Sequence, residues 1–305
     1  MARRFLGREV VTMSRTISPS TGRVYGLKRV CEVWDVARST LYAAQLSKAT
    51  PLRRGPKPIV EDEKLLNMIQ KDLSTTPFSG EGHKKVHARL KRQGVKVGRN
   101  RVLKIMKINR LMSPHRGVYK ATNPHDGKII TDAPGVMWGS DGMKVQTADD
   151  GWAWVFSVTE HWNSECLGWH VCKTGERFAA LEPVTQAVKK IYGFLNKDVA
   201  KGLQLRIDNG SQYTSDYFLQ QLAYWGIKSS FGLIRQPETN GVSERFNRTL
   251  KEQVINGRIF QDIEELREAV RLFAEVYNVQ WLVAKMGYKS PYEARSSYNK
   301  IKEAA

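Results

Sequence analysis

The chain has 305 residues, enough for two or three domains with one substantial core, and a formal net charge of +19. No apolar run approaches the roughly 18 residues of a membrane span, no signal-peptide pattern opens the chain, and its three cysteines lack metal-ligand or disulfide-framework spacing. These features exclude a membrane protein and a disulfide-rich secreted one, and we expect a cytoplasmic protein.

The charged residues are distributed unevenly along the chain. Residues 1–130 contain 28 Lys and Arg against 9 Asp and Glu, whereas residues 131–305 contain 21 of each. The whole excess of positive charge therefore belongs to the N-terminal part. Lysines that only kept a surface soluble would be spread more evenly, so the segregation favours a basic DNA-binding region attached to a domain of balanced charge.

Residues 1–50 form a helix-turn-helix candidate. The first fifteen are basic without a clear pattern, and we expect partial disorder there. Apolar residues at helical spacing predict a short helix over 26–34. Ser39 is expected to cap the beginning of a second short helix, which contains residues 40–44. The second helix, with Thr40, would enter the major groove, although any small helical hairpin shares this pattern. Residues 51–60 follow as a basic, proline-rich linker.

Residues 61–112 form a second helical unit. Periodicity predicts three helices, the first from about Glu61, the second over 83–93 and the third over 99–109. The last two carry basic side chains that we expect to contact the DNA backbone, Lys84, Lys85, Arg99 and Arg101. The alternative is a helix face that is only solvated.

Residues 113–134 are rich in Pro and Gly and predict an interdomain linker. In residues 135–260 the pattern changes to three strands, a helix, a strand, a helix, a strand and a helix. These elements are expected at 137–146, 152–159, 166–173, 177–194, 203–207, 217–225, 227–230 and from about 243. Two helices, over 262–277 and 291–300, occupy residues 261–305. The tryptophans of the first two strands, Trp138, Trp152 and Trp154, are expected to pack against the sheet.

Three carboxylates stand out in this part of the chain. Asp208 follows the apolar run 203–207 and precedes a turn, and Asp141 likewise follows a short strand. Glu244 lies at the start of a helix, and 35 residues separate it from Asp208. Two aspartates on strands and a glutamate on a later helix could converge on a divalent cation site. A site with two such ions cuts and joins phosphodiesters by in-line displacement.

These residues lie in three blocks that resemble the catalytic blocks of the insertion-sequence transposases within the retroviral-integrase superfamily. The blocks are residues 138–141, 208–213 and 240–251. The gap between Asp208 and Glu244 matches that family's Asp–Asp–35–Glu spacing, and Lys251 matches its usual place. Residues 81–112 are also similar to the second helix-turn-helix that precedes the catalytic domain in these transposases.

The resemblance implies an α/β fold. A ribonuclease-H-like catalytic domain, built on a mixed five-stranded sheet with helices, would be preceded by all-α helix-turn-helix segments, and the order of the predicted elements agrees with it. The implied activity is that of a DNA transposase acting on element terminal repeats and target DNA. The chain resembles the downstream, OrfB-type product of a two-reading-frame element. We therefore also expect self-association on DNA and an upstream-frame helix-turn-helix product or fusion as a partner.

Metal chemistry gives the three carboxylates their roles. Asp141 and Asp208 would ligate and bridge two Mg²⁺ ions, for which Mn²⁺ could substitute, and Glu244 would complete one site. Crowded without a cation, the three groups would repel one another. Water would first release a 3′-hydroxyl at the element end, and that hydroxyl would then attack another phosphodiester.

Several neighbours of the carboxylates are expected to contact DNA. Arg248 and Lys251 share a helix face with Glu244 and would meet phosphate near the scissile bond. Asn209 lies in the turn after the second aspartate, where a following glycine permits a close approach of DNA. The alternative for the two cations is a pair of surface charges that interact with Glu252.

The sequence departs from the family pattern at two places. Ser140-Asp141-Gly142 stands where Thr-Asp-Ile or Thr-Asp-Leu is more usual, and Tyr277-Asn278 lacks the Arg and His that commonly follow. The second departure puts the C-terminal contacts in doubt rather than the metal site. Two other functions remain open: a non-catalytic sequence-specific DNA-binding regulator or inactive transposase remnant, and a structure-specific nuclease. Metal-dependent strand joining would separate all three.

Overall fold

The computed structural model describes four stretches of the chain, residues 2–46, 59–113, 129–232 and 240–304. The chain divides into two compact units, Met1–Pro58 and Ile59–Ala305. The linkers expected at 51–60 and 113–134 fall mostly outside the described residues. Within the described stretches, no helix combines the length and the apolar character that a membrane span requires.

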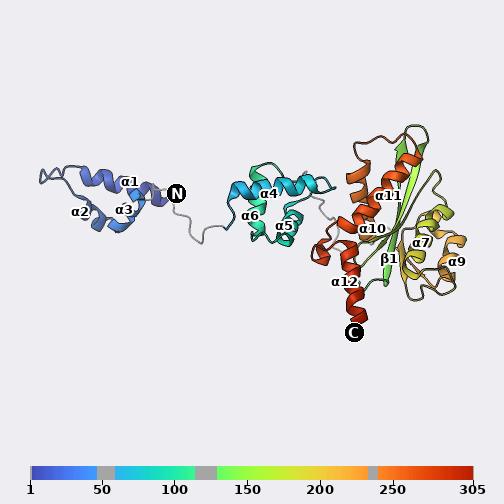
Figure 1. Cartoon of the computed structure of the whole chain (residues 1–305). Coiled ribbons are helices and arrows are strands. Elements are labelled where there is room, and N and C mark those ends of the chain that lie inside the picture. The colour runs from blue at the N-terminus through green and yellow to red at the C-terminus, as the bar shows by residue number, and fades with distance from the viewer. Residues whose placement is uncertain (1, 47–58, 114–128, 233–239, 305) are drawn as a thin grey trace. The chain divides into compact units, whose positions relative to one another are not determined.

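The first unit is a small helical bundle. Its helices are α1 (Ala2–Arg15), α2 (Leu27–Val33) and α3 (Arg38–Leu46) (Figure 1). Its core consists of Val10, Val30, Cys31 and Leu41. The basic N-terminus, for which the sequence predicts partial disorder, is instead a helix, because Val10 can pack into this core. Ser39 lies inside α3 rather than capping it, and Thr40 is exposed on the same helix.

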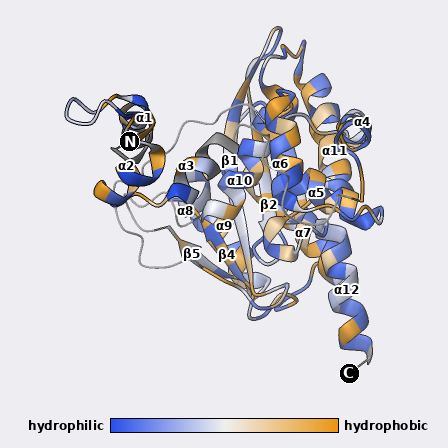
Figure 2. Ribbon diagram, turned by 90° about the vertical axis from the view of Figure 1, so that its left-hand side faces the viewer, coloured by the Kyte–Doolittle hydropathy of each residue, from blue (hydrophilic) through white to orange (hydrophobic). Residues whose placement is uncertain are grey.

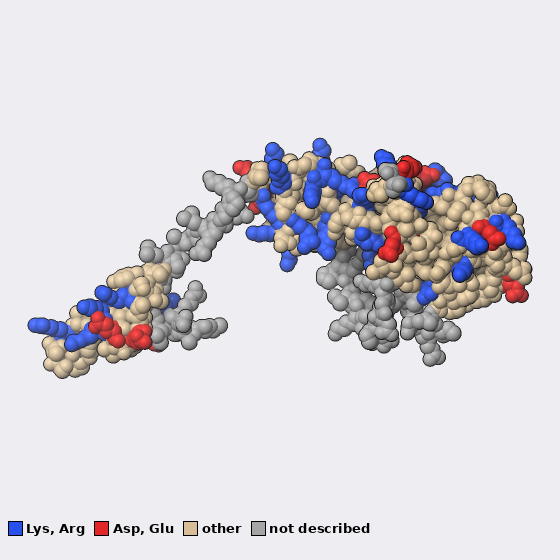
Figure 3. All heavy atoms as spheres, turned by 90° about the horizontal axis from the view of Figure 1, so that it is seen from below, with Lys and Arg blue, Asp and Glu red and all other residues tan. Residues whose placement is uncertain are grey.

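The second unit begins with three helices, α4 (Asp62–Thr75), α5 (His83–Arg92) and α6 (Arg99–Ile108). They bury one another's apolar faces around Leu65, Ile69, Val86, Leu90, Val102, Ile105 and Met106. Arg89 of α5 binds both carboxylate oxygens of Asp72 in α4 and also pairs with Glu81. Lys and Arg side chains gather on the outer surface of these helices (Figure 3).

A mixed five-stranded sheet forms the centre of the second unit. Its strands are β1 (Met137–Thr147), β2 (Gly151–Glu160), β3 (Cys166–Cys172), β4 (Gln204–Ile207) and β5 (Lys228–Phe231). The order across the sheet is β3-β2-β1-β4-β5. The first three strands are antiparallel, and β4 and β5 continue the sheet in parallel beside β1. This confirms the expected ribonuclease-H-like fold.

Helices cover both faces of the sheet. On one face, α7 (Arg177–Tyr192), the short α8 (Ser211–Thr214) and α9 (Asp216–Tyr224) pack on Trp138, Phe156 and Val158. On the other, α10 (Gly241–Leu250) and α11 (Ile263–Gln280) pack on Met143, Val145 and Val155. Figure 1 shows these two layers on either side of β1. Alternate residues of β2 thus face different layers, as the two-residue period of a strand requires.

The remaining helical elements are η2 (Lys251–Ile255), a π-helical turn that continues α10, the 3₁₀ turn η3 (Ala284–Met286) and α12 (Pro291–Ala304). Most of α12 is hydrophilic (Figure 2). It is held to the sheet by Arg295, which pairs with Glu165, and to α5 by the pair Arg92–Glu293 at 3.0 Å. Phe78, from the loop after α4, contacts Phe273 and Trp281 edge-on. The three N-terminal helices of this unit therefore pack against its sheet domain.

Candidate functional site

Two of the three predicted carboxylates lie at the same level on neighbouring strands. β1 and β4 pair in parallel with Gly139 opposite Arg206, and two residues further along each strand come Asp141 and Asp208. Asp141 is half-buried within β1, whereas Asp208 directly follows β4 and is exposed. The parallel pairing, which needs a long crossover, thus brings together side chains 67 residues apart in sequence.

The charges around Asp141 act in opposite directions. Burial raises the pKa of Asp141 above its ordinary value. Hydrogen bonds from Asn247 and Gly142 lower this pKa in part, the charge of Asp208 raises it, and the nearby Lys251 cation lowers it. Two carboxylates that repel each other in a partly desolvated place favour a bound cation, and their hard oxygen donors suit Mg²⁺. The chemistry of these two donors therefore suits Mg²⁺.

Glycines shape the chain around both aspartates. The Asp208 carboxylate accepts a hydrogen bond from the Gly210 N–H at 2.9 Å, which closes a turn directly after β4. A Cβ on Gly210 would lie 2.9 Å from Asp208 Oδ1. Beside Asp141, a Cβ on Gly142 would lie 2.6 Å from the ring of Phe156. The Phe156 ring therefore accounts for glycine where the family usually has Ile or Leu.

Helix α10 lies unusually close to β1. A Cβ on Gly139 would lie 2.3 Å from Ser243 Oγ and 2.7 Å from Asn240 Oδ1, so only glycine permits this approach. Asn240 Nδ2 donates to the Ser140 carbonyl at 2.8 Å, and Ser243 Oγ lies 2.8 Å from Thr159 Oγ1. These contacts fix the start of α10 next to the strand that carries Asp141.

Asn247 connects the same helix directly to the carboxylate. Its Nδ2 donates to Asp141 Oδ2 at 2.8 Å, while its Oδ1 accepts from Ser157 Oγ at 3.0 Å. The Ser157 hydroxyl thereby fixes the orientation of the amide, and the amide fixes the Asp141 carboxylate. The sequence reasoning assigned no role to Asn240, Ser243 or Asn247. Their spacing of three and then four residues, which places polar groups on one helix face, was the available signal.

The third predicted carboxylate, Glu244, lies in the first turn of α10 and is exposed. Three residues along a helix correspond to about 60° of rotation, so Glu244 lies next to the face that carries Asn247. Within the described stretches, no group of three His, Cys, Asp or Glu side chains is placed to hold a metal ion. The structure thus brings together Asp141 and Asp208, and convergence of Glu244 with them stays a prediction.

The DNA contacts predicted near the carboxylates fall in different places. Lys251 opens η2 and lies close enough to Asp141 for its charge to lower the pKa of that carboxyl. Asn209 is exposed, and its Nδ2 donates to the Gly232 carbonyl at 3.3 Å. Arg248 is exposed on α10 and lines a pocket between α10 and the start of α5, within the second unit.

The predicted contacts from the N-terminal helices also differ from one another. Lys84 is exposed and lines the same pocket. Lys85 instead pairs with Glu81 at 3.0 Å and lies over the Trp281 ring. Arg101 pairs with Asp62, whereas Arg99 is exposed. Thr40 belongs to the first unit, on the exposed side of α3.

Comparisons with known proteins show which families and chains this protein is similar to. Two family models, both described as integrase core domain, match residues 131–237 and 225–291. The chain is 25% identical to the transposase for insertion sequence element IS629 of Shigella sonnei, over 90% of this chain and 93% of that one. It is 29% identical to a protein assigned as transposase of element IS986/IS6110 in Mycobacterium tuberculosis, over 71% and 82%. The HTLV-2 integrase catalytic core in complex with magnesium is similar over 53% of this chain and 96% of its own, with 16% identity and a TM-score of 0.38.

Proposed function

Because the chain belongs to the insertion-sequence transposases that carry an integrase core domain, we propose that it cleaves and joins the ends of an insertion element. The reactions are metal-dependent phosphodiester hydrolysis followed by transesterification. The observation that carries this proposal is the paired placement of Asp141 and Asp208 on parallel strands, with the Glu244 helix fixed beside them through Asn247.

Each residue of the site has a distinct task in this proposal. Asp141, Asp208 and Glu244 hold the divalent ions, which supply activation of the attacking oxygen and stabilisation of the leaving one. Asn247 is a positioning residue, because its Nδ2 donates to one oxygen of Asp141 at 2.8 Å and so fixes the orientation of that carboxylate. Lys251, which already interacts with Asp141, meets the phosphate beside the scissile bond.

The reaction sequence needs no covalent enzyme intermediate. Water attacks the phosphorus at the element end, the bond to the leaving 3′-oxygen breaks, and a free 3′-hydroxyl remains. That hydroxyl then attacks a phosphodiester of target DNA, which exchanges one phosphodiester bond for another. Terminal repeats and target DNA are thus the partners, and self-association on DNA would bring two element ends together.

The domains predicted from the sequence divide this work. The segments 1–50 and 61–112, which contain most of the basic excess, bind the DNA, and residues 135–260 perform the chemistry. Action on chromosomal or plasmid DNA places the protein in the cytoplasm. An upstream-frame helix-turn-helix product would add specificity for the element ends.

Strand joining on a defined DNA end tests the proposal. The DNA that flanks the gene is first searched for short inverted repeats, a duplex that ends in such a repeat is the substrate, and the measurement is joining with and without Mg²⁺. Asp208→Asn should abolish cleavage and joining and leave DNA binding nearly intact. Asp216→Asn, which removes an exposed carboxylate from the first turn of α9, is the control and should join normally. Joining by the Asp208 variant at even about a tenth of the normal rate, a loss of only ~1.4 kcal/mol, would remove this residue from the ligand set.

A further inference from the structure

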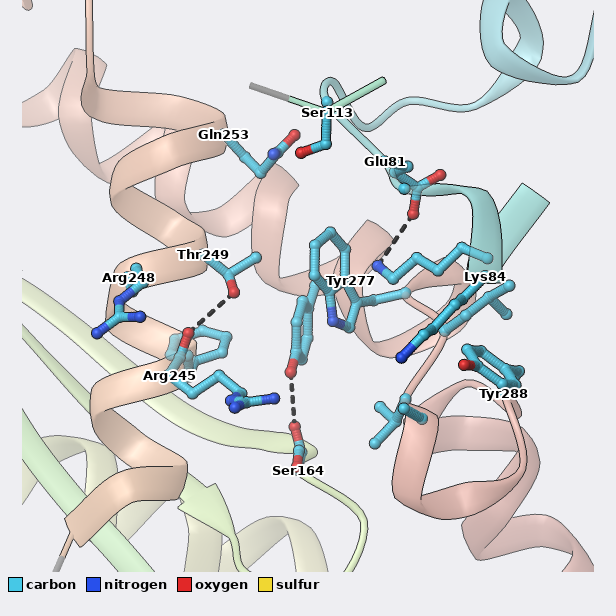
Figure 4. Close-up of a pocket in the computed structure, with 18 of the residues that line it drawn as sticks. Glu81, Lys84, Ser113, Ser164, Arg245, Arg248, Thr249, Gln253, Tyr277 and Tyr288 are labelled. Atoms are coloured by element: carbon cyan, nitrogen blue, oxygen red, sulfur yellow. Dashed lines mark hydrogen bonds and ion pairs between the residues drawn. The ribbon is translucent and has the colours of Figure 1, made fainter. Parts of the chain in front are cut away.

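A hollow of about 510 Å³ lies between the start of α5 and the side of α10 that faces away from the sheet (Figure 4). Its volume is within the range of sites that take small organic molecules. Its lining includes basic and aromatic side chains, among them Lys84, Arg245, Arg248, Tyr277, Trp281 and Tyr288. None of the roles assigned to the carboxylate site uses this hollow.

The walls of the hollow are fixed by hydrogen bonds between distant parts of the second unit. Ser79 N donates to Gln253 Oε1 at 2.8 Å, and Gln253 Nε2 donates back to the Ser79 carbonyl at 3.0 Å. On the other side, Arg92 donates to the Tyr288 carbonyl at 2.7 Å and pairs with Glu293. The hollow is therefore a built feature of this unit rather than a gap between loose segments.

The rim of the hollow is basic. Lys84 and Arg245 extend toward it from opposite walls, and Arg248 lies one helical turn after Arg245 (Figure 4). The acidic group at this rim, Glu81, is already neutralised by Lys85 at 3.0 Å and by Arg89. In the part of the chain that the structure describes, Lys84, Arg245 and Arg248 form no ion pair with a carboxylate. The rim therefore presents positive charge that attracts an anion.

The interior of the hollow is aromatic. Tyr277 is buried, and its ring stacks on that of Trp281 with centroids 5.7 Å apart. Tyr288 lines the opposite side. Lys85 Nζ lies 2.8 Å from the centroid of the Trp281 ring, on which Tyr277 also stacks. A flat apolar group would therefore be desolvated mainly against Tyr288 and beside this covered pair, while an attached anion meets the rim. A nucleotide combines these two features, because its base is flat and its phosphate is charged.

We propose that this hollow binds one unpaired nucleotide of single-stranded DNA, with the base against the aromatic wall and the flanking phosphates on Lys84 and Arg245. The inference rests on the proposed function, because Arg245 directly follows Glu244 on α10. A DNA strand bound at the carboxylates would therefore extend close to the basic rim of the hollow. A base in a duplex is stacked and paired, so only a frayed or extruded nucleotide can enter.

The test is a binding measurement that needs no catalysis. The full chain carrying Asp208→Asn is titrated, in EDTA, with a labelled oligo-dT of about eight nucleotides and separately with a hairpin duplex of about 20 base pairs. Lys84→Ala with Arg245→Ala should lower the affinity for oligo-dT about tenfold. The affinity for the duplex should fall only about threefold, because Lys84 is also an expected contact of the duplex backbone whereas Arg245 is not. 4-Thiothymidine in the oligonucleotide should crosslink to the peptides that contain Trp281 or Tyr288.

The matched control is Lys189→Ala with Lys197→Ala, which removes the same charge from exposed positions at and after the end of α7. That pair should change neither affinity by more than about twofold. Arg245→Lys, which keeps the charge on an exposed helix position, should retain most of the oligo-dT affinity. Equal losses for oligo-dT and duplex, or crosslinks that avoid both peptides, would overturn the proposal. If the wild-type protein failed to join strands while these binding results held, the proposed function would be contradicted and the nucleotide site would not, because the binding measurement is made without metal.

Discussion

At the scale of single residues, the orientation of Asp141 depends on groups that come from three separate parts of the chain. Its two oxygens accept from the adjacent Gly142 N–H at 2.9 Å and from Asn247 at 2.8 Å. Ser157 then determines which end of the Asn247 amide faces the carboxylate. In its proposed role as a metal ligand, Asp141 would lose little freedom when an ion binds, which is the usual benefit of hydrogen-bonded outer partners.

Asn247→Ala should impair catalysis without impairing DNA binding. The change leaves one oxygen of Asp141 and the Ser157 hydroxyl without their partner, at a cost of about 1–3 kcal/mol in the free energy of unfolding. Joining should fall at least about tenfold, as for other lost outer partners of metal sites. Gln220→Ala, which removes an exposed amide from α9, is the control. Normal joining by the Asn247 variant would show that Asp141 needs no such support.

His161 is a buried residue that gives the fold a dependence on pH. Burial lowers the pKa of His161 from 6.5 to about 4, helped by the positive charges of Lys285 and Arg206. Neither ring nitrogen has a hydrogen-bond partner among the described residues. The unfolded chain takes up a proton near pH 6.5 and the folded one does not, so stability is lost as the pH falls from 6.5 toward 4.

His161→Gln should remove this dependence. The loss over that pH window amounts to about 3 kcal/mol in the wild type for this residue alone. Denaturant unfolding at several pH values between 4 and 7 measures it. The variant, which carries a polar side chain that does not titrate, should show a flatter curve through this window. Parallel curves for the two proteins would mean that His161 is not held neutral by the fold.

At the scale of elements, the contact between α10 and β1 determines where the Glu244 helix begins. Gly139→Ala places a methyl group 2.3 Å from Ser243 Oγ, so α10 must move away from the strand. Overpacking of this kind costs about 1–3 kcal/mol, and the shift would also separate Asn247 from Asp141. Thermal unfolding and strand joining should both suffer.

Gly241 provides a matched comparison on the same helix. A Cβ there meets nothing within 4 Å, so Gly241→Ala should leave the melting temperature and the joining rate almost unchanged. If both glycine variants behaved alike, the close approach of the helix would not be what Gly139 provides.

The elements also show which features a sequence can reveal. Asp141, Asp208 and the strand-helix order were predicted because each depends on local pattern and residue type. Asn247 was missed because its partner Asp141 lies 106 residues away. The spacing of polar residues along the helix marks a polar face, but it does not identify that partner. Trp138 is fully buried as expected, but Trp152 is 57% exposed. Trp152 shares a face of β2 with Trp154 and Phe156, but burial on that face decreases from Phe156 through Trp154 to Trp152 at the beginning of the strand.

The helix α1 was not predicted either, because it too depends on contacts with residues that are distant in the sequence. Half of its residues are charged or polar, and an isolated helix of this length is marginal in water. Val10 becomes fully buried against residues of α2 and α3, and that tertiary packing stabilises the helix.

At the scale of the whole molecule, the basic excess is shared between the two units. Residues 1–58 carry 12 Lys and Arg against 3 Asp and Glu, a net charge of +9, and residues 59–130 carry 16 against 6, a net charge of +10. The boundary between the units follows Pro58. Phe78, which the sequence places in an N-terminal helical segment, belongs to the same buried cluster as Phe273. A cut at residue 58 therefore preserves the packing that a cut at residue 130 would break.

Removal of residues 1–58 should weaken DNA binding in a way that salt reveals. Each phosphate contact contributes about −0.9 to the slope of log affinity against log salt concentration, so a fragment 59–305 should show a slope that is shallower by several units. Its thermal unfolding should stay cooperative, because the fragment coincides with a compact unit. Anisotropy titrations of one duplex at several salt concentrations compare the two proteins. Identical salt slopes for the full chain and the fragment would mean that the first unit makes no phosphate contacts. The helices α4–α6 and the sheet domain would then make all the electrostatic contacts with DNA.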